Sequence, residues 1–145
     1  MKCLIQRPEI TKEQKIETLE LFGASIITEC DPGIEKGFKY IKNGMKERFA
    51  NPSQPLLKQQ IKPVKAYQNR KECQTLEELA QIEGDVGAIV MESLYIRERI
   101  LGKENAELQL LYQISHVASC YLRNNDLSAC IRLRRRAMKT LQSLF

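Results

Sequence analysis

The sequence predicts an all-α protein built from antiparallel helix pairs, a segment of a tetratricopeptide-like helical repeat. Three observations lead to this prediction. Apolar residues make up 43% of the 145 residues, and Leu and Ile supply half of them without the Val/Thr alternation of strands. Apolar positions recur at steps of three and four, and capping residues or Pro and Gly separate the periodic stretches. The length suits one core, so we expect residues 1–145 to form a single helical domain.

The first helix pair is expected at about residues 12–49. Thr11 and Gln14 form a capping-box pattern at its start. Asp31-Pro32-Gly33 separates the two helices. The apolar face of the first is Ile16, Leu19, Phe22, Gly23 and Ile26, and that of the second is Ile34, Phe38, Ile41, Met45 and Phe49. Gly37 and Gly44 lie beside the second stripe, where small residues let two helices approach closely.

A connector is expected at about residues 50–74. Pro52, Pro55 and Pro63 interrupt this stretch, and proline blocks continuous helix. Within it, we expect at most a short helical turn around Leu56 and Leu57.

Further helices are expected at about residues 75–144. Thr75 and Glu78 form a second capping box, opening a short helix through Leu79 and Ile82. Asp85 is expected to cap a helix that runs to Leu101, with Gly102 as its C-terminal stop.

The last two helices form the pair that resembles a tetratricopeptide repeat most closely, at residues 104–144. The long helix from about residue 104 to 123 carries Leu108, Leu111, Ser115, Ala118 and Leu122 in register. After Asn124-Asn125, Asp126 caps a final helix with Leu127, Cys130, Ile131, Ala137, Met138 and Leu141.

The repeat pattern requires small residues where its two helices cross. The last pair matches it with Ile114, Val117, Ala118, Tyr121, Cys130 and Ala137, and the first pair with Leu19, Phe22, Gly23, Ile26, Gly37, Ile41 and Gly44. Arg134 departs from the pattern, which has a large apolar residue there. It is expected to point towards the stripe of Cys130 and Ala137 with a carboxylate partner, or to mark the open end of the helix stack.

Several classes of function lack support in the sequence. No apolar run reaches the roughly 20 residues of a membrane span, and the first ten residues do not form a signal peptide. The five cysteines are scattered and only one histidine could join them, so we expect neither a metal site nor a cofactor. His116 and Cys73 are therefore interpreted as ordinary packing or surface residues, and the protein as no enzyme. Reduced thiols suit a cytoplasmic location, with the nucleus as an alternative.

A basic run near the C-terminus is the candidate binding site. Arg132, Arg135, Arg136 and Lys139 share one helical face at i, i+3, i+4 and i+7. The run can be a solvated face near a helix C-terminus, where positive charge is favourable, or a docking surface for an acidic protein segment. Nucleic acid is the less favoured partner, because no aromatic residues interleave the charges.

Four segments resemble the Fem (feminization) family: IETLELFGAS (16–25), KAYQNRKEC (65–73), MESLYIRERILG (91–102) and, more loosely, ACIRLRRRAM (129–138). They follow the family's order. The resemblance implies the central tetratricopeptide-like region of a substrate receptor of cullin–RING ubiquitin ligases. Such receptors carry ankyrin repeats on both sides of this region and a C-terminal box that docks onto elongin and cullin.

The chain also departs from the family. It has no TPLHxA ankyrin pattern, so residues of the degron pocket in the N-terminal ankyrin array cannot be carried over. It also lacks the docking box, and Arg134 stands where the family has Trp.

Two functional hypotheses follow. The first is a non-catalytic scaffold or adaptor segment of a cullin–RING receptor, whose partners are ligase components reached through the parent receptor or a second copy of the chain. The alternative is a free-standing helical peptide-binding module with a basic docking face.

Overall fold

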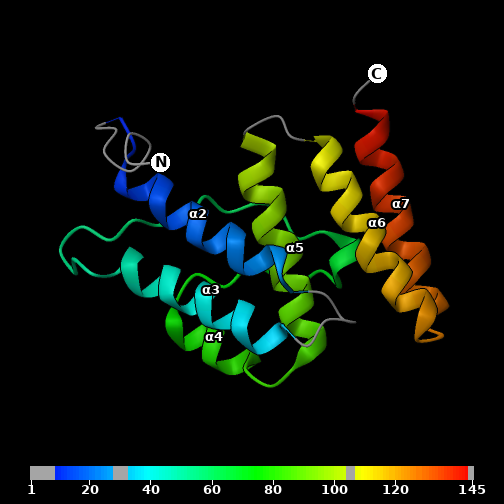
Figure 1. The fold of residues 1–145 in the computed structure, drawn as a ribbon, viewed down its shortest axis with the longest axis horizontal. Helices are drawn as coiled ribbons and strands as arrows, with labels where there is room; N and C mark the ends of the chain where they lie inside the picture. The colour runs from blue at the N-terminus through cyan, green and yellow to red at the C-terminus, as the bar shows by residue number, and fades with distance from the viewer. Residues whose placement is uncertain (1–8, 28–32, 104–106, 144–145) are drawn as a thin grey trace.

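The computed structural model describes residues 9–27, 33–103 and 107–143, and within them the chain is helical with no strand. The α-helices are α2 (Lys12–Ser25), α3 (Ile34–Arg48), α4 (Leu76–Ile82), α5 (Val86–Lys103), α6 (Glu107–Arg123) and α7 (Leu127–Gln142), with a 3-10 turn η1 (Lys65–Tyr67). In Figure 1, α5 runs through the middle, with α2, α3 and α4 on one side of it and α6 and α7 on the other. The predicted all-helical fold class is confirmed.

Most predicted helix starts are confirmed by their capping bonds. Thr11 and Gln14 form the reciprocal capping box, with the Gln14 N–H donating to Thr11 Oγ1 over 3.1 Å. Asp85 accepts from the Ala88 N–H and Asp126 from the Ala129 N–H, at 3.1 and 3.0 Å. Thr75 caps α4, but the Glu78 carboxylate accepts from the Gln74 N–H instead of completing the box.

The close crossing of α2 and α3 depends on glycine, as expected. A Cβ at Gly37 would lie 2.6 Å from the carbonyl oxygen of Gly23, and one at Gly23 would lie 2.7 Å from that of Gly37. Either distance is too short for a side chain. Gly44 makes room for a different neighbour, because its Cβ would lie 2.7 Å from Cγ of Glu20.

A buried charge cluster lies where α2, α3, the connector and α5 meet, and sequence reasoning did not foresee it. Its members are the carboxylates Glu20, Glu72 and Glu92 and the cations Arg48, Lys58 and Arg99, all buried. Such charges are stable in the interior only when they are paired and hydrogen-bonded. Here three glutamate side chains lie among the three cations.

Short ion pairs connect the cluster. Glu20 accepts from Nε and Nη2 of Arg48 at 3.0 and 2.8 Å, and from Arg99 at 3.2 Å. Arg99 Nε also donates to both oxygens of Glu72, at 2.9 and 3.1 Å, and Lys58 Nζ donates to Glu72 at 2.9 Å. Burial alone would raise the pKa of Glu20, but the Arg48 bond and the nearby cations hold it below its ordinary value. The connector is thus anchored to the core through Lys58.

Arg97 stabilises the C-terminal end of α2. Its buried guanidinium donates to the carbonyl oxygens of Ala24 and Ile27. Helix C-termini leave such carbonyls without intrahelical partners, and a cation there is favourable.

Several predicted positions are wrong, and tertiary packing explains each. In α6, Leu108 and Leu122 are 68% and 48% exposed. The buried face is Leu110, Ile114, Val117, Ala118, Cys120 and Tyr121, because α5 and α7 cover that side instead. In α7, Ala129 and Leu133 are buried, whereas Leu127, Ile131 and Met138 are exposed.

The predicted face of α2 and two predicted local features also need correction. Phe22 is exposed, and Glu20 and Ala24 take buried positions of α2. Gly102 does not stop α5, which continues to Lys103. Leu56 and Leu57 form no helical turn, because the connector has no regular secondary structure where it carries Lys58 into the charge cluster. The predicted break at Asp31-Pro32, the start of the long helix at residue 104 and the end of the last at 144 lie outside the described residues.

Candidate partner-binding groove

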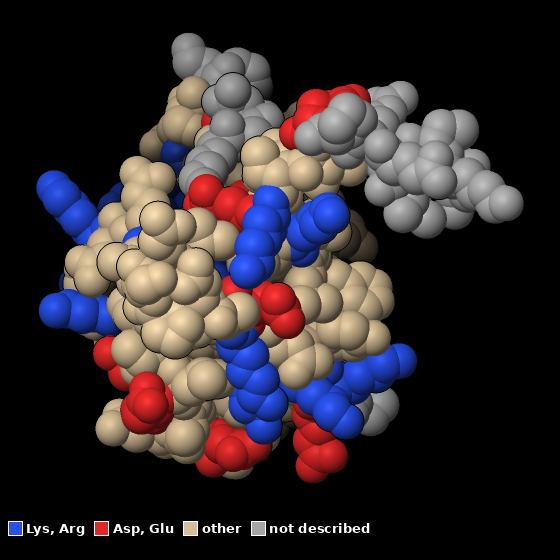
Figure 2. Space-filling model, turned by 90° about the vertical axis from the view of Figure 1, so that its left-hand side faces the viewer, with Lys and Arg blue, Asp and Glu red and all other residues tan. Residues whose placement is uncertain are grey.

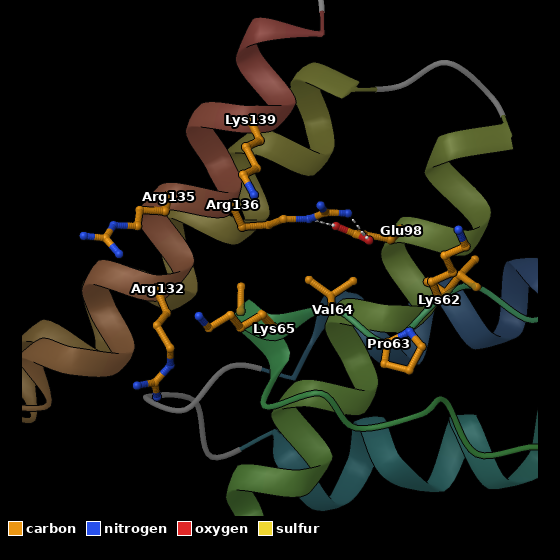
Figure 3. A pocket seen from close by; sticks show the side chains of 11 residues that line it. Lys62, Pro63, Val64, Lys65, Glu98, Arg132, Arg135, Arg136 and Lys139 are labelled. Carbon is orange, nitrogen blue, oxygen red and sulfur yellow. Dashed lines mark hydrogen bonds and ion pairs between the residues drawn. The ribbon is translucent and has the colours of Figure 1, made fainter.

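A groove of about 590 Å³ lies between α7 and the end of the connector (Figure 3). We call it the basic groove. Its lining residues are Ile61, Lys62, Pro63, Val64, Lys65, Ala66, Glu98, Arg132, Arg135, Arg136 and Lys139. All four residues of the predicted basic face therefore lie along one wall.

The packing of α7 turns its basic face towards this groove. Leu133 and Ala137 are buried on α7, and α7 packs mainly against α6. Residues 132, 135, 136 and 139 then lie to one side of that contact, because a helix repeats every 3.6 residues. Arg135 and Lys139 are exposed, and their side chains bond to no residue in the described part of the chain. Arg132 donates to Ser128 Oγ over 2.8 Å on the same helix.

Arg136 differs from the other three, because it is already paired. Its Nε and Nη2 donate to the two carboxylate oxygens of Glu98, each over 2.8 Å. Tyr67 Oη donates to Glu98 as well, also over 2.8 Å. The bond to Glu98 raises the pKa of Arg136, and burial together with the Glu98 charge raises the pKa of Tyr67. The trio joins α7, α5 and η1, so Arg136 fixes the position of the α7 wall.

The opposite wall is a short stretch without regular secondary structure that is held at both ends, and Val64 in it has extended backbone. Before it, Lys58 is fixed in the charge cluster. After it, the Val64 N–H donates to Tyr95 Oη over 2.7 Å, and the Val64 carbonyl accepts from the Asn69 N–H over 3.0 Å. Gln68 and Asn69 have left-handed backbone, which Asn tolerates and which lets the chain turn back after η1. Lys62 and Lys65 are exposed on this wall.

Positive charge is concentrated in the basic groove. Six of its lining residues are Lys or Arg and one is Glu, so it carries a net charge equal to the +5 of the whole chain. The rest of the chain is therefore balanced. Figure 2 shows a different face, the left-hand side of Figure 1, where Lys and Arg are interspersed with Asp and Glu.

Sequence reasoning missed three charged residues of the groove, namely Lys62, Lys65 and Glu98. The lysines lie in the connector, far from α7 in sequence, and only the folded chain brings them opposite it. One feature of the sequence could have drawn attention to Tyr67 and Glu98, because both lie in segments that resemble the Fem family.

Arg134 lies on a different side of α7. The prediction that it points towards Cys130 and Ala137 is wrong, because its side chain is exposed and donates to Ser119 Oγ of α6 over 3.2 Å. Around it are the exposed residues Leu127, Ile131 and Met138 of α7. Arg134 thus lies on the outward side of the α6–α7 pair, and the alternative that this side is the open end of a helix stack stays a prediction.

The other residues considered from sequence lie away from the basic groove. His116 stacks on Tyr112, with ring centroids 6.4 Å apart, on the half-exposed side of α6. Cys73 is buried, and burial raises the pKa of its thiol far above the ordinary value. Within the described ranges, no three His, Cys, Asp or Glu residues gather as metal ligands, and no helix has the length and apolarity needed to cross a bilayer.

Comparison with known proteins gives relatives of one kind. No model of a known protein family matches the chain. It is 30% identical over 145 residues to protein fem-1 homolog A of Danio rerio, covering 99% of this chain and 23% of that protein. It is 29% identical over 141 residues to protein fem-1 homolog C of Xenopus laevis and 28% identical over 141 residues to that of Homo sapiens, covering 97% of this chain and 22% of each relative. The chain thus spans less than a quarter of the curated relatives it matches.

Proposed function

Because this chain is related to the Fem-1 proteins over one region of their length, we propose that it acts as a non-catalytic scaffold segment of a cullin–RING substrate receptor. Its role would be to hold the substrate-binding and ligase-docking parts of the receptor at a fixed separation and orientation. Ligase components would be reached through the parent receptor, in the cytoplasm.

The observation that carries the proposal is where the resembling segments lie in the fold. Glu20 belongs to the first, Tyr67 and Glu72 to the second, and Glu98 and Arg99 to the third. These residues bond to one another: Arg99 joins Glu20 and Glu72, and Glu98 joins Tyr67. The segments therefore meet in the interior. Contacts among the three segments in one interior support a rigid framework, which is what a spacer between two binding regions requires.

The surroundings of Cys73 agree with a role without catalysis by this thiol. Nucleophilic catalysis needs an activated nucleophile within hydrogen-bond reach of a base. Cys73 is buried, and burial together with the neighbouring Glu92 carboxylate raises the pKa of its thiol, so the reactive thiolate is disfavoured. The mechanism we propose is positioning, in which bond chemistry is left to the ligase.

A chimeric receptor tests the proposal. The matching region of the Danio rerio fem-1 homolog A is replaced by these 145 residues, and the protein is assayed for co-purification with cullin and elongin and for loss of a receptor-dependent reporter. We expect both activities to be retained. A folded chimera that binds cullin but leaves the reporter intact would refute fixed spacing as the role of this chain.

Two controls make the result specific. In one, the region is replaced by a flexible Gly–Ser linker, and in the other by an unrelated helical bundle of similar length. Both should lose reporter turnover, because neither reproduces the geometry. Equal turnover with the Gly–Ser linker would show that rigidity in this region is unnecessary.

A second candidate, a free-standing peptide-binding module, is favoured by the basic groove. The two candidates differ in whether the chain works within a larger receptor. Binding to the groove can be measured on the 145-residue chain under either.

A further inference from the structure

We propose that the basic groove binds an acidic segment of a partner protein in extended conformation, with carboxylates on alternate residues. The proposal concerns the occupant of the groove and does not depend on the scaffold role. Its argument rests on the charges without partners, their spacing along α7 and the shape of the opposite wall.

The groove already shows which anion its arginines accept. Arg136 holds Glu98 through two parallel hydrogen bonds of 2.8 Å, the two-point geometry that guanidinium makes with carboxylate. Lys139 lies next to this pair, whereas the Arg135 side chain points away from it across α7, and neither has a partner in the described ranges (Figure 3). Two carboxylates from outside would therefore give partners to the two cations that Glu98 leaves unpaired.

The spacing of these cations suits an extended peptide. A helix rises about 1.5 Å per residue, so Arg135 and Lys139 are separated by roughly 6 Å along α7. An extended chain advances about 3.3 Å per residue, so its side chains at i and i+2 are separated by roughly 6.6 Å and point the same way. Acidic residues at alternate positions would meet Arg135 and Lys139 in turn, with Arg132 one turn further on.

The opposite wall supports the same conformation. Ile61, Pro63 and Val64 give it apolar surface, while Lys62 and Lys65 add charge. The backbone N–H groups of Ile61 and Lys62 make no hydrogen bond within the described ranges, and because adjacent N–H groups point in opposite directions, an extended partner can pair with one of them. Residues between the acidic ones would face this wall, and small β-branched side chains suit it.

A nucleic-acid strand fits the groove less well. Strand binding without sequence preference depends on aromatic side chains that stack on the bases. No Phe, Tyr, Trp or His is among the residues that line the groove.

The test measures fluorescence anisotropy of labelled eight-residue peptides with the 145-residue chain. One peptide has glutamate at alternate positions with valine or threonine between them. A second has glutamine in place of glutamate, and a third carries the same four glutamates in one block. We expect the alternating glutamate peptide to bind at least about tenfold more tightly than either, and its affinity to fall as salt rises from 50 to 150 mM, as charge screening requires.

Two charge-reversal variants locate the site. R135E with K139E changes two exposed cations of the groove, whereas K36E with K39E makes the same change in net charge on α3. We expect the first to weaken binding of the alternating peptide about tenfold or more and the second to change it less than about twofold. Equal weakening by both would overturn the proposal, because affinity would then follow net charge alone.

Three further results would also overturn it. They are undetectable binding of the alternating peptide, equal binding of the glutamine peptide, and tighter binding of an eight-nucleotide single-stranded DNA than of any peptide. The peptide comparison uses the wild-type chain alone, so it stands even if a variant fails to fold.

Discussion

Removing the charge of Glu20 while keeping its shape tests the buried charge cluster directly. Glu20→Gln leaves a side chain of nearly the same size against Gly44, so cavity formation contributes little. It removes the carboxylate that accepts two hydrogen bonds from Arg48 and one from Arg99, at 2.8–3.2 Å. Both arginines are buried, so water cannot replace the lost partner. Breaking a buried ion pair from one side costs about 3–5 kcal/mol.

That loss is large for a chain of this size. Domains unfold with a free energy of about 5–15 kcal/mol, and in domains of about 150 residues each kcal/mol shifts Tm by about 2–4 °C. Urea unfolding followed by circular dichroism at 222 nm should therefore show a much lower midpoint for Glu20→Gln, and thermal unfolding should show a Tm roughly 6–20 °C lower.

The chain offers a matched control for this substitution. Glu83 pairs with Lys42 at 2.7 Å, but this pair is solvent-exposed. Glu83→Gln should cost less than about 1 kcal/mol, the usual value of a surface pair. If Glu20→Gln were no more destabilising than Glu83→Gln, the cluster would add nothing beyond surface electrostatics and the reasoning would be refuted.

Three other predictions concern single positions. Gly37→Ala should destabilise by about 2 kcal/mol or more, since its Cβ would lie 2.6 Å from the Gly23 carbonyl, whereas Gly102→Ala, with nothing within 4 Å, should stabilise by about 0.5–1 kcal/mol in the same urea assay. Burial raises the pKa of Glu92 to about 7, so the folded chain keeps a proton that the unfolded chain loses near 4.5. The free energy of unfolding should then fall as pH rises from about 5 to 7, and Glu92→Gln should remove that part of the slope; an unchanged slope would show that Glu92 is ionised throughout. Cys73 should resist iodoacetamide at pH 8 until urea is added, which peptide mass spectrometry can follow; rapid labelling of the folded chain would contradict its burial.

Local signals in the sequence predicted the helices well. Thr11, Asp85 and Asp126 cap the helices they were assigned to, because a capping bond joins residues three apart and needs no knowledge of the fold. Helix faces were less predictable. In α6 the apolar residues fit two different buried faces of the helix. Only the positions of α5 and α7 decide that Ile114 is buried and Leu108 exposed.

The buried charge cluster could not be derived from local patterns. Arg99 lies 79 residues from Glu20 and 27 from Glu72, so no helical spacing relates them. One indirect signal was present: seven of the nine residues from Ala88 to Ile96 are apolar, and a helix with apolar residues on most sides lies in the interior. Glu92 and Arg99 on such a helix must therefore have buried partners, although the sequence does not identify them.

The cluster also has a consequence for how the chain folds. Its charges come from α2, α3, the connector and α5, and Arg99 of α5 bonds to both Glu20 of α2 and Glu72 of the connector. A form lacking one of these elements would leave at least one of these ions without a partner. Forms in which only some of these elements are assembled are therefore high in free energy. We expect α2, α3, the connector and α5 to fold and unfold as one cooperative unit. The α6–α7 pair contributes nothing to the cluster and is joined to α5 and η1 through packing and the Glu98–Arg136 pair. It can open at lower free energy while the rest of the fold stays intact, which places the α7 wall on the more easily opened part of the molecule.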